Sequence, residues 1–178
     1  LHLTISPGAH VDLPIFGLAF ANFGIRPWGF VDSVPRRNLA TNWDYHAKYY
    51  GSINDRWLQI RTENPQLDWF TSPMAYIRDV TSSTAFCYSG PMEQKTVDII
   101  QGYGEEHLDR WLSWWDDAEP TKPEERAGLA QLTEDLRRVV AVKDPANSVA
   151  TRLFGQDITD NLVSALWGEH RVLPRAGL

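Results

Sequence analysis

The sequence predicts an α+β fold, in which an antiparallel sheet is flanked by helices. Strand-like segments occupy most of the first half of the chain and amphipathic helical segments occupy the second half, an order typical of this class. The 178 residues, of which 43% are hydrophobic and 22% are charged, suffice for one domain with a buried core. We therefore expect a single domain over residues 1–178.

Three strand-like segments come first, at residues 1–5, 14–21 and 26–32. Serine, proline and glycine residues separate them, and such short links predict antiparallel pairing because a parallel pair needs a long crossover. Two further strand-like segments follow at 74–80 and 84–88. Because the chain starts at Leu1, already inside a strand-like segment, we expect the fold to lack its N-terminal part.

A short helix is expected after the first three strands. Asn42 or Asp44 is suited to cap its start, and Gly51 is suited to end it just after Tyr50. The following residues, to about Phe70, are expected to form a loop.

Three longer helices are expected in the second half of the chain. Apolar residues recur at helical spacing along 97–115, 129–140 and 158–167. The second of these helices must bend or stop at Asp144, because Pro145 disfavours a helical conformation in the residue before it.

Composition and charge exclude several classes of protein. The net charge is −6, and the acidic excess lies in residues 101–178, so no basic stripe is present that would neutralise nucleic-acid phosphates. Cys87 is the single cysteine, which excludes an intrachain disulfide and a cysteine-based zinc site. The sequence contains no run of 18 apolar residues that would span a membrane, and no targeting segment is visible.

The common cofactor and catalytic motifs are also missing from the sequence. It contains no glycine-rich phosphate loop, no dinucleotide-binding fingerprint and no Gly-x-Ser-x-Gly elbow. No two histidines are spaced as i and i+4, as helical metal ligands would be, so no bound metal is expected. The eight tryptophans either fill a wide core or line a pocket for a flat, apolar ligand, and we favour the core.

The motifs that are present resemble one superfamily. The stretch VDLPIFG at 11–17 resembles the Asp-Leu-Pro-x-Phe-Gly strand of ferredoxin-dependent bilin reductases. The stretches VDSVPRRNLATNWDYHAKYY at 31–50 and SPMAYIRDVTSSTA at 72–85 resemble the related red chlorophyll catabolite reductases. KDPANSVATRLFGQDITDNLV at 143–163 is similar to the C-terminal helix pair of both branches, and the middle of the chain favours the chlorophyll-catabolite branch.

The resemblance implies a fold, a substrate and an electron donor. The fold is an α-β-α sandwich, with an open-chain tetrapyrrole between the sheet and the C-terminal helices. Electrons arrive one at a time from reduced ferredoxin, and the protein holds no metal or flavin of its own. Its own contribution is to bind the pigment and to supply protons to it. The same resemblance implies the plastid stroma if the source is eukaryotic, and otherwise the cytoplasm.

The resemblance also implies two proton donors, and the sequence departs from one of them. The family carries an acid just after the Phe-Gly of the opening strand, and in this sequence that position is Ala19. From Leu13 to Gly24 there is no ionisable side chain. The second acid corresponds to Asp144, which otherwise serves as a turn or cap residue before Pro145.

His2 is a possible helper in catalysis, because it falls where bilin reductases carry a histidine facing the pigment. The alternative is a histidine on a frayed terminal strand.

Further residues are expected to bind the substrate. Arg78 and Arg37 are suited to hold pigment propionates, because a guanidinium binds a carboxylate through two hydrogen bonds. For Arg36 and Arg37 the alternatives are a docking spot for ferredoxin or a solvated turn, and for Arg78 a pair with a surface acid. The other expected pocket residues are Phe16, Ala19, Trp28, Phe30 and Ser72.

Two functions therefore remain open on the sequence. One is ferredoxin-dependent reduction of a linear tetrapyrrole, and the other is tetrapyrrole binding without catalysis, which Ala19 favours. A third alternative is an α+β domain whose motifs agree with the family by chance. The sequence does not identify the pigment, the reduced bond or the oligomeric state.

Overall fold

The computed structural model describes residues 1–22 and 24–167. These residues form two compact units, one up to Leu129 and one from Ala130 onward, and the boundary falls within one helix. The prediction of a single domain over 1–178 stays a prediction. None of the helices in the described part is long and apolar enough to cross a membrane.

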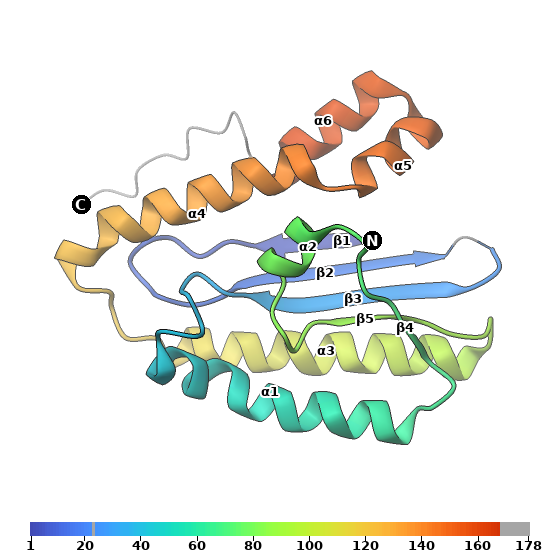
Figure 1. The fold of residues 1–178 in the computed structure, drawn as a ribbon, viewed down its shortest axis with the longest axis horizontal. Coiled ribbons are helices and arrows are strands. Elements are labelled where there is room, and N and C mark those ends of the chain that lie inside the picture. The colour runs from blue at the N-terminus through green and yellow to red at the C-terminus, as the bar shows by residue number, and fades with distance from the viewer. Residues whose placement is uncertain (23, 168–178) are drawn as a thin grey trace. The chain divides into compact units, whose positions relative to one another are not determined.

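The first unit contains an antiparallel sheet of five strands in the order β1-β2-β3-β5-β4 (Figure 1). Strands β1, β2 and β3 are adjacent in sequence and in space, as their short links predict. The α+β class and the antiparallel sheet are confirmed. The strands are β1 (His2–Ile5), β2 (Ile15–Asn22), β3 (Pro27–Val34), β4 (Asp68–Trp69) and β5 (Phe86–Ser89).

Helices α1 (Trp43–Glu63) and α3 (Gln94–Asp116) lie against one face of this sheet (Figure 1). The core between them consists mainly of aromatic and branched side chains. Trp111 of α3 is 2% exposed, and its indole N–H donates a hydrogen bond to the Pro14 carbonyl oxygen. Gly104 lets α3 approach the sheet closely, since a Cβ there would lie 2.7 Å from the Phe20 ring. Trp111 thus fills the core, the use that the sequence favours for the tryptophans.

Helix α1 is longer than the sequence predicts. The helix begins after Asn42, as expected, but it passes Gly51 and continues to Glu63. Its buried face extends from Tyr49 and Tyr50 to Ile53 and Ile60, so burial of the later turns outweighs the cost of about 1 kcal/mol of one helical glycine.

The strand predicted at 74–80 is wrong. These residues form a short helix, α2 (Ala75–Val80), and Arg78 therefore lies on a helix and not in the middle of a strand. Ser72 accepts a hydrogen bond from the backbone N–H of Met74 just before α2, a local bond that competes with a strand ladder.

The second unit contains most of α4 (Pro123–Lys143) together with α5 (Ala146–Phe154) and α6 (Gln156–Trp167). Helix α4 ends just before Asp144, as Pro145 predicts. Gly155 joins α5 to α6 with φ of 83°, a left-handed conformation that favours glycine. Thr159 on α6 donates through its hydroxyl to the Gly155 carbonyl oxygen at 2.8 Å, which fixes this corner.

Candidate functional site

The two faces of the sheet differ in what covers them within the first unit. Side chains alternate between the faces along a strand, and residues paired across strands share a face. Phe16 and Val31 belong to the core beside α3, and the Ser33 hydroxyl lies 3.0 Å from the His107 imidazole on the same helix. The residues that alternate with these along β2 and β3 therefore point to the opposite face, which we call the open face.

The strand register defines the residues of the open face. One row crosses all four neighbouring strands, because His2 pairs with Ala19, Ala19 with Phe30, and Phe30 with Cys87. The next row contains Thr4, Gly17 and Asp32. The centre of the open face thus carries small and apolar residues. His2 lies at one edge of this face, and the carboxyl of Asp32 lies in the row next to Ala19 and Phe30.

Trp28 and Phe30 extend this apolar surface along β3. Their rings are nearly parallel, with an angle of 8° and centroids 6.4 Å apart. Both side chains are half-buried. Burial raises the pKa of the neighbouring Cys87 thiol to about 12, so this sulfur stays protonated at neutral pH. Two flat rings beside small residues suit the binding of a flat, apolar ligand.

Asp32 is the residue of this face that sequence reasoning missed. The sequence suggested that it lies at a strand end, but it lies inside β3 opposite Gly17 and is 1% exposed. The Ser82 backbone N–H donates to its carboxylate at 2.8 Å, and the Ser82 hydroxyl donates at 2.5 Å. Burial raises the pKa of Asp32 to about 6, although hydrogen bonds from Ser82 and Ser33 act to lower it. The position was detectable in the sequence, because Asp32 is two residues beyond Phe30 and so shares its face.

A second titratable group, His107, lies on the core side of the sheet. Its imidazole contacts the Ser33 hydroxyl, and the Tyr103 hydroxyl lies 3.5 Å from its other nitrogen. Burial lowers the pKa of His107 to about 3, so the ring is neutral at physiological pH. His107 is therefore part of the core.

Phe16 does not lie with the other predicted pocket residues. It is fully buried, and its ring lies 6.0 Å from the His107 ring and 6.3 Å from the Trp111 ring. It thus belongs to the face covered by α3, and we do not include it in the candidate site.

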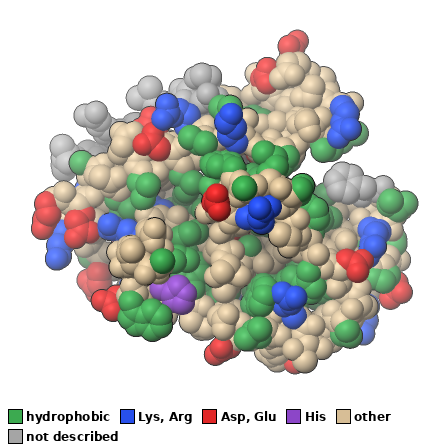
Figure 2. All heavy atoms as spheres, in the orientation of Figure 1, with side chains coloured by type: hydrophobic (Ala, Val, Ile, Leu, Met, Phe, Trp, Pro, Cys, Tyr) green, Lys and Arg blue, Asp and Glu red, His purple; other side chains and the backbone are tan. Residues whose placement is uncertain are grey.

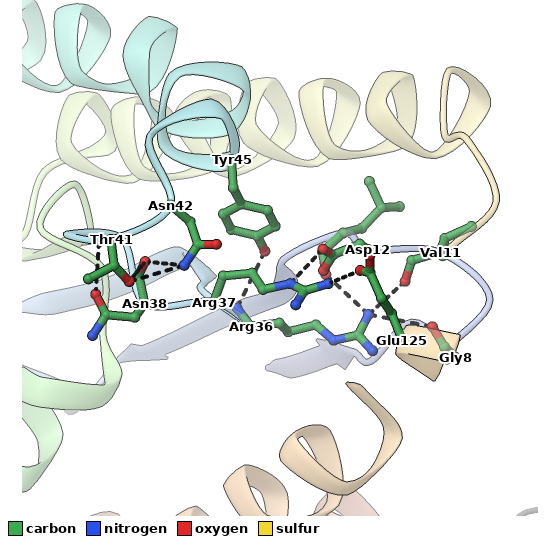
Figure 3. Close-up of polar contacts among 11 residues, drawn as sticks. Gly8, Val11, Asp12, Arg36, Arg37, Asn38, Thr41, Asn42, Tyr45 and Glu125 are labelled. Carbon is green, nitrogen blue, oxygen red and sulfur yellow. Dashed lines mark hydrogen bonds and ion pairs between the residues drawn. The ribbon is translucent and has the colours of Figure 1, made fainter. Parts of the chain in front are cut away.

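Arg36 is not the solvated turn residue or docking spot that the sequence allowed. It is 1% exposed, and its guanidinium donates to the carbonyl oxygens of Val11 and Leu13 (Figure 3). Its charge therefore anchors the segment that leads into β2.

Arg37 lies in a shallow cavity of about 490 Å³ together with Asp12, Trp43 and Glu125. Its guanidinium forms ion pairs with Asp12 at 2.7 Å and Glu125 at 2.9 Å (Figure 3). A pigment propionate would compete with these two carboxylates for the guanidinium. Binding of a propionate by Arg37 stays a prediction.

Arg78 and Ser72 lie together at α2. The Arg78 guanidinium donates to the Ser72 carbonyl oxygen at 2.7 Å, and the arginine side chain is exposed. Among the described residues, Arg78 forms no ion pair with a surface acid, so the pairing alternative finds no support. The exposed guanidinium has further donors for an anionic ligand.

Asp144 belongs to the second unit. Its carboxylate accepts a hydrogen bond from the Ala146 backbone N–H at 2.8 Å, so it caps the turn between α4 and α5. Its role as a proton donor stays a prediction. This unit also contains a cavity of about 530 Å³ with a largely polar lining that includes Asn147, Ser148, Thr159 and Asp160.

Two classes of ligand, nucleic acids and metal ions, find little support on the described residues. On the side shown in Figure 2, the Lys and Arg side chains form separate spots and no continuous basic patch. Within the described part of the chain, no group of three or more His, Cys, Asp or Glu side chains is placed to hold a metal ion.

Comparisons with known proteins match this chain to a family model and to solved structures. The family model for red chlorophyll catabolite reductase matches residues 29–167. A crystal structure of phytochromobilin synthase from tomato, in complex with biliverdin, matches with a TM-score of 0.84 and 19% sequence identity. The match covers 98% of this chain and 62% of that protein, so the chain spans less than two thirds of its length. No curated protein matches the sequence.

Proposed function

This chain belongs to the red chlorophyll catabolite reductase family, and from that premise we propose that it reduces a double bond of a linear tetrapyrrole with electrons from ferredoxin. The family match over residues 29–167 is the observation that carries the proposal. The shared fold with phytochromobilin synthase, a protein crystallised with biliverdin, supports it independently.

The open face is the surface that we assign to the pigment. Ala19 and Gly17 are small residues on the same face as the parallel rings of Trp28 and Phe30, and a flat tetrapyrrole matches such an apolar surface in shape and polarity. Arg78 is our candidate for a propionate, because its guanidinium is exposed and has donors beyond its bond to Ser72.

Proton delivery is the chemical task that we assign to the protein. Asp144 is proposed as one donor, since it follows the break of α4 at the family position. His2 is proposed as a helper, because it lies in the same row as Ala19. The electrons are proposed to come from ferredoxin, and no metal or flavin is proposed. We place the protein in the plastid stroma if its source is eukaryotic, and otherwise in the cytoplasm.

An anaerobic assay with photoreduced ferredoxin tests this function. Purified protein is mixed separately with red chlorophyll catabolite and with biliverdin, and the absorption spectrum is followed before and after illumination. We expect a spectral shift on binding, followed by loss of the conjugated absorption of one of the two pigments. Omission of ferredoxin is the control, and it should leave only the binding shift.

Pigment binding without catalysis is the second candidate function, and Ala19 is the observation that favours it. It predicts the binding shift for at least one pigment and no further change under illumination. Absence of any shift with both pigments would contradict both functions.

A further inference from the structure

We propose that Asp32 is the proton donor of the sheet in this protein and takes the place of the acid that is missing at residue 19. This inference rests on the proposed reduction of a tetrapyrrole. Asp32 is a catalytic residue in this proposal: its side chain lies on the open face, and its carboxyl, which is buried and hydrogen-bonded to Ser82, would donate its proton to pigment bound there.

The strand register brings Asp32 close to the position that has lost its acid. Ala19 pairs with Phe30, and Asp32 lies two residues further along the same strand and on the same face. It is thus the diagonal neighbour of Ala19, and such neighbours lie about 7–8 Å apart, with a somewhat shorter distance between their Cβ atoms. A long acidic side chain at residue 19 and the carboxyl of Asp32 can therefore reach the same pigment atom.

The surroundings of Asp32 suit a carboxyl that holds its proton until it donates it to the pigment. The carboxyl is shielded from water, and its pKa of about 6 leaves part of the population protonated near neutral pH. The Ser82 hydroxyl, which contacts Asp32, also lies 3.1 Å from the Thr84 hydroxyl. Two linked hydroxyls next to a carboxyl offer a short path for replacing its proton.

Other titratable groups near Asp32 do not take over this role at neutral pH. Cys87 on β5 stays protonated, and the Tyr50 hydroxyl of α1 donates to the Ser33 carbonyl oxygen on the core side. On α2, Arg78 and Asp79 are exposed. His2 on β1 shares the open face and is a second candidate donor there.

Atoms and electrons balance in the proposed step. Reduction of one double bond adds two electrons, taken singly from two reduced ferredoxins, and two protons. Asp32 transfers one proton to the one-electron-reduced pigment and becomes a carboxylate, which then takes a replacement proton from water. The second proton comes from a separate donor, for which Asp144 is our candidate.

Asp32→Asn in the ferredoxin assay tests the inference. We expect kcat to fall by about 100-fold or more, with the pigment affinity unchanged, because a general acid contributes about 10²–10⁴ in rate. Adding Ala19→Glu to this variant should restore at least about a tenth of the turnover, since it returns a carboxyl to the same face. Asp55→Asn, an exposed change on α1, is the matched control and should leave turnover unchanged.

Ser82→Ala gives a second measurement that keeps the carboxyl. The hydrogen bond from Ser82 lowers the pKa of Asp32, so its loss should move the alkaline limb of the kcat–pH profile to higher pH. Turnover of Asp32→Asn within about threefold of the wild type would overturn the inference while leaving the proposed function intact. A wild type that reduces neither pigment would instead overturn the proposed function, and the inference with it.

Discussion

At the scale of single residues, two buried titratable groups, Asp32 on β3 and His107 on α3, have opposite effects on how the stability of the fold depends on pH. Burial raises the pKa of Asp32 from 3.8 to about 6, so the folded state binds more protons than the unfolded state between these values. Stability therefore falls as pH rises through this window, and above it the folded protein carries the full cost of a buried carboxylate. His107 has its pKa lowered from 6.5 to about 3, so stability falls as pH drops below 6.5. Between about pH 4 and 6 the two contributions largely cancel.

Asp32→Asn should reveal this cost. The amide oxygen still accepts from the Ser82 backbone N–H and the amide nitrogen donates to the Ser82 hydroxyl, so the local geometry is retained. At pH 7.5 we expect the free energy of unfolding to be equal to that of the wild type or greater, by up to about 3 kcal/mol, because about two pKa units are relieved. The advantage should shrink towards pH 4.

Urea unfolding of both proteins at pH 7.5 and pH 4.5 measures this difference. A loss of about 2 kcal/mol or more at pH 7.5 in the variant would mean that the ionised Asp32 stabilises the fold, and it would contradict the expected cost of the buried carboxylate. A residue that costs stability where it is ionised is instead typical of a functional group.

At the scale of helices and strands, the sequence supported most elements and failed where local patterns are weak. Helices α3, α4 and α6 follow their apolar periodicity, and β1, β2 and β3 match the strand-like segments closely. The short run at 74–80 contains branched and aromatic residues that fit either a strand or a helix, and a local hydrogen bond at Ser72 accompanies the helical outcome. Gly51 predicts an early end of α1, but the buried side chains of Ile53 and Ile60 stabilise the helix beyond this glycine.

Two glycines of α3 give a matched test of helix packing. A Cβ at Gly104 would lie 2.7 Å from the Phe20 ring and 3.1 Å from the Leu18 side chain, whereas a Cβ at Gly102 would meet nothing within 4 Å. Gly102→Ala should raise the free energy of unfolding by about 0.5–1 kcal/mol, because alanine is the better helix former. Gly104→Ala should lower it by about 1–3 kcal/mol, because the helix is forced away from the sheet.

Thermal or urea unfolding of the two variants side by side checks this contrast. Equal changes in both would show that α3 does not press on β2 through Gly104.

At the scale of the whole molecule, the family was accessible from the sequence, whereas part of the site was not. The motifs at 31–50 and 72–85 resembled the red chlorophyll catabolite reductases, and the family model confirms that membership over residues 29–167. The site was harder to predict because it depends on which residues lie across from one another. Ala19 stood out in the sequence as the position without the family's acid, but the register that puts Asp32 diagonally opposite becomes visible only once β2 and β3 are paired. Phe16 was misassigned to the pocket for the same reason, since its face is set by contact with α3.

The mass of the pigment after one turnover tests the proposed reductase activity most directly. Protein loaded with red chlorophyll catabolite or biliverdin is mixed anaerobically with two equivalents of reduced ferredoxin, and the extracted pigment is analysed by mass spectrometry. We predict a product heavier by two hydrogen atoms from at least one of the two pigments. Recovery of both pigments unchanged, although the spectrum shows that they were bound, would contradict this activity and leave a binding protein in place of a reductase.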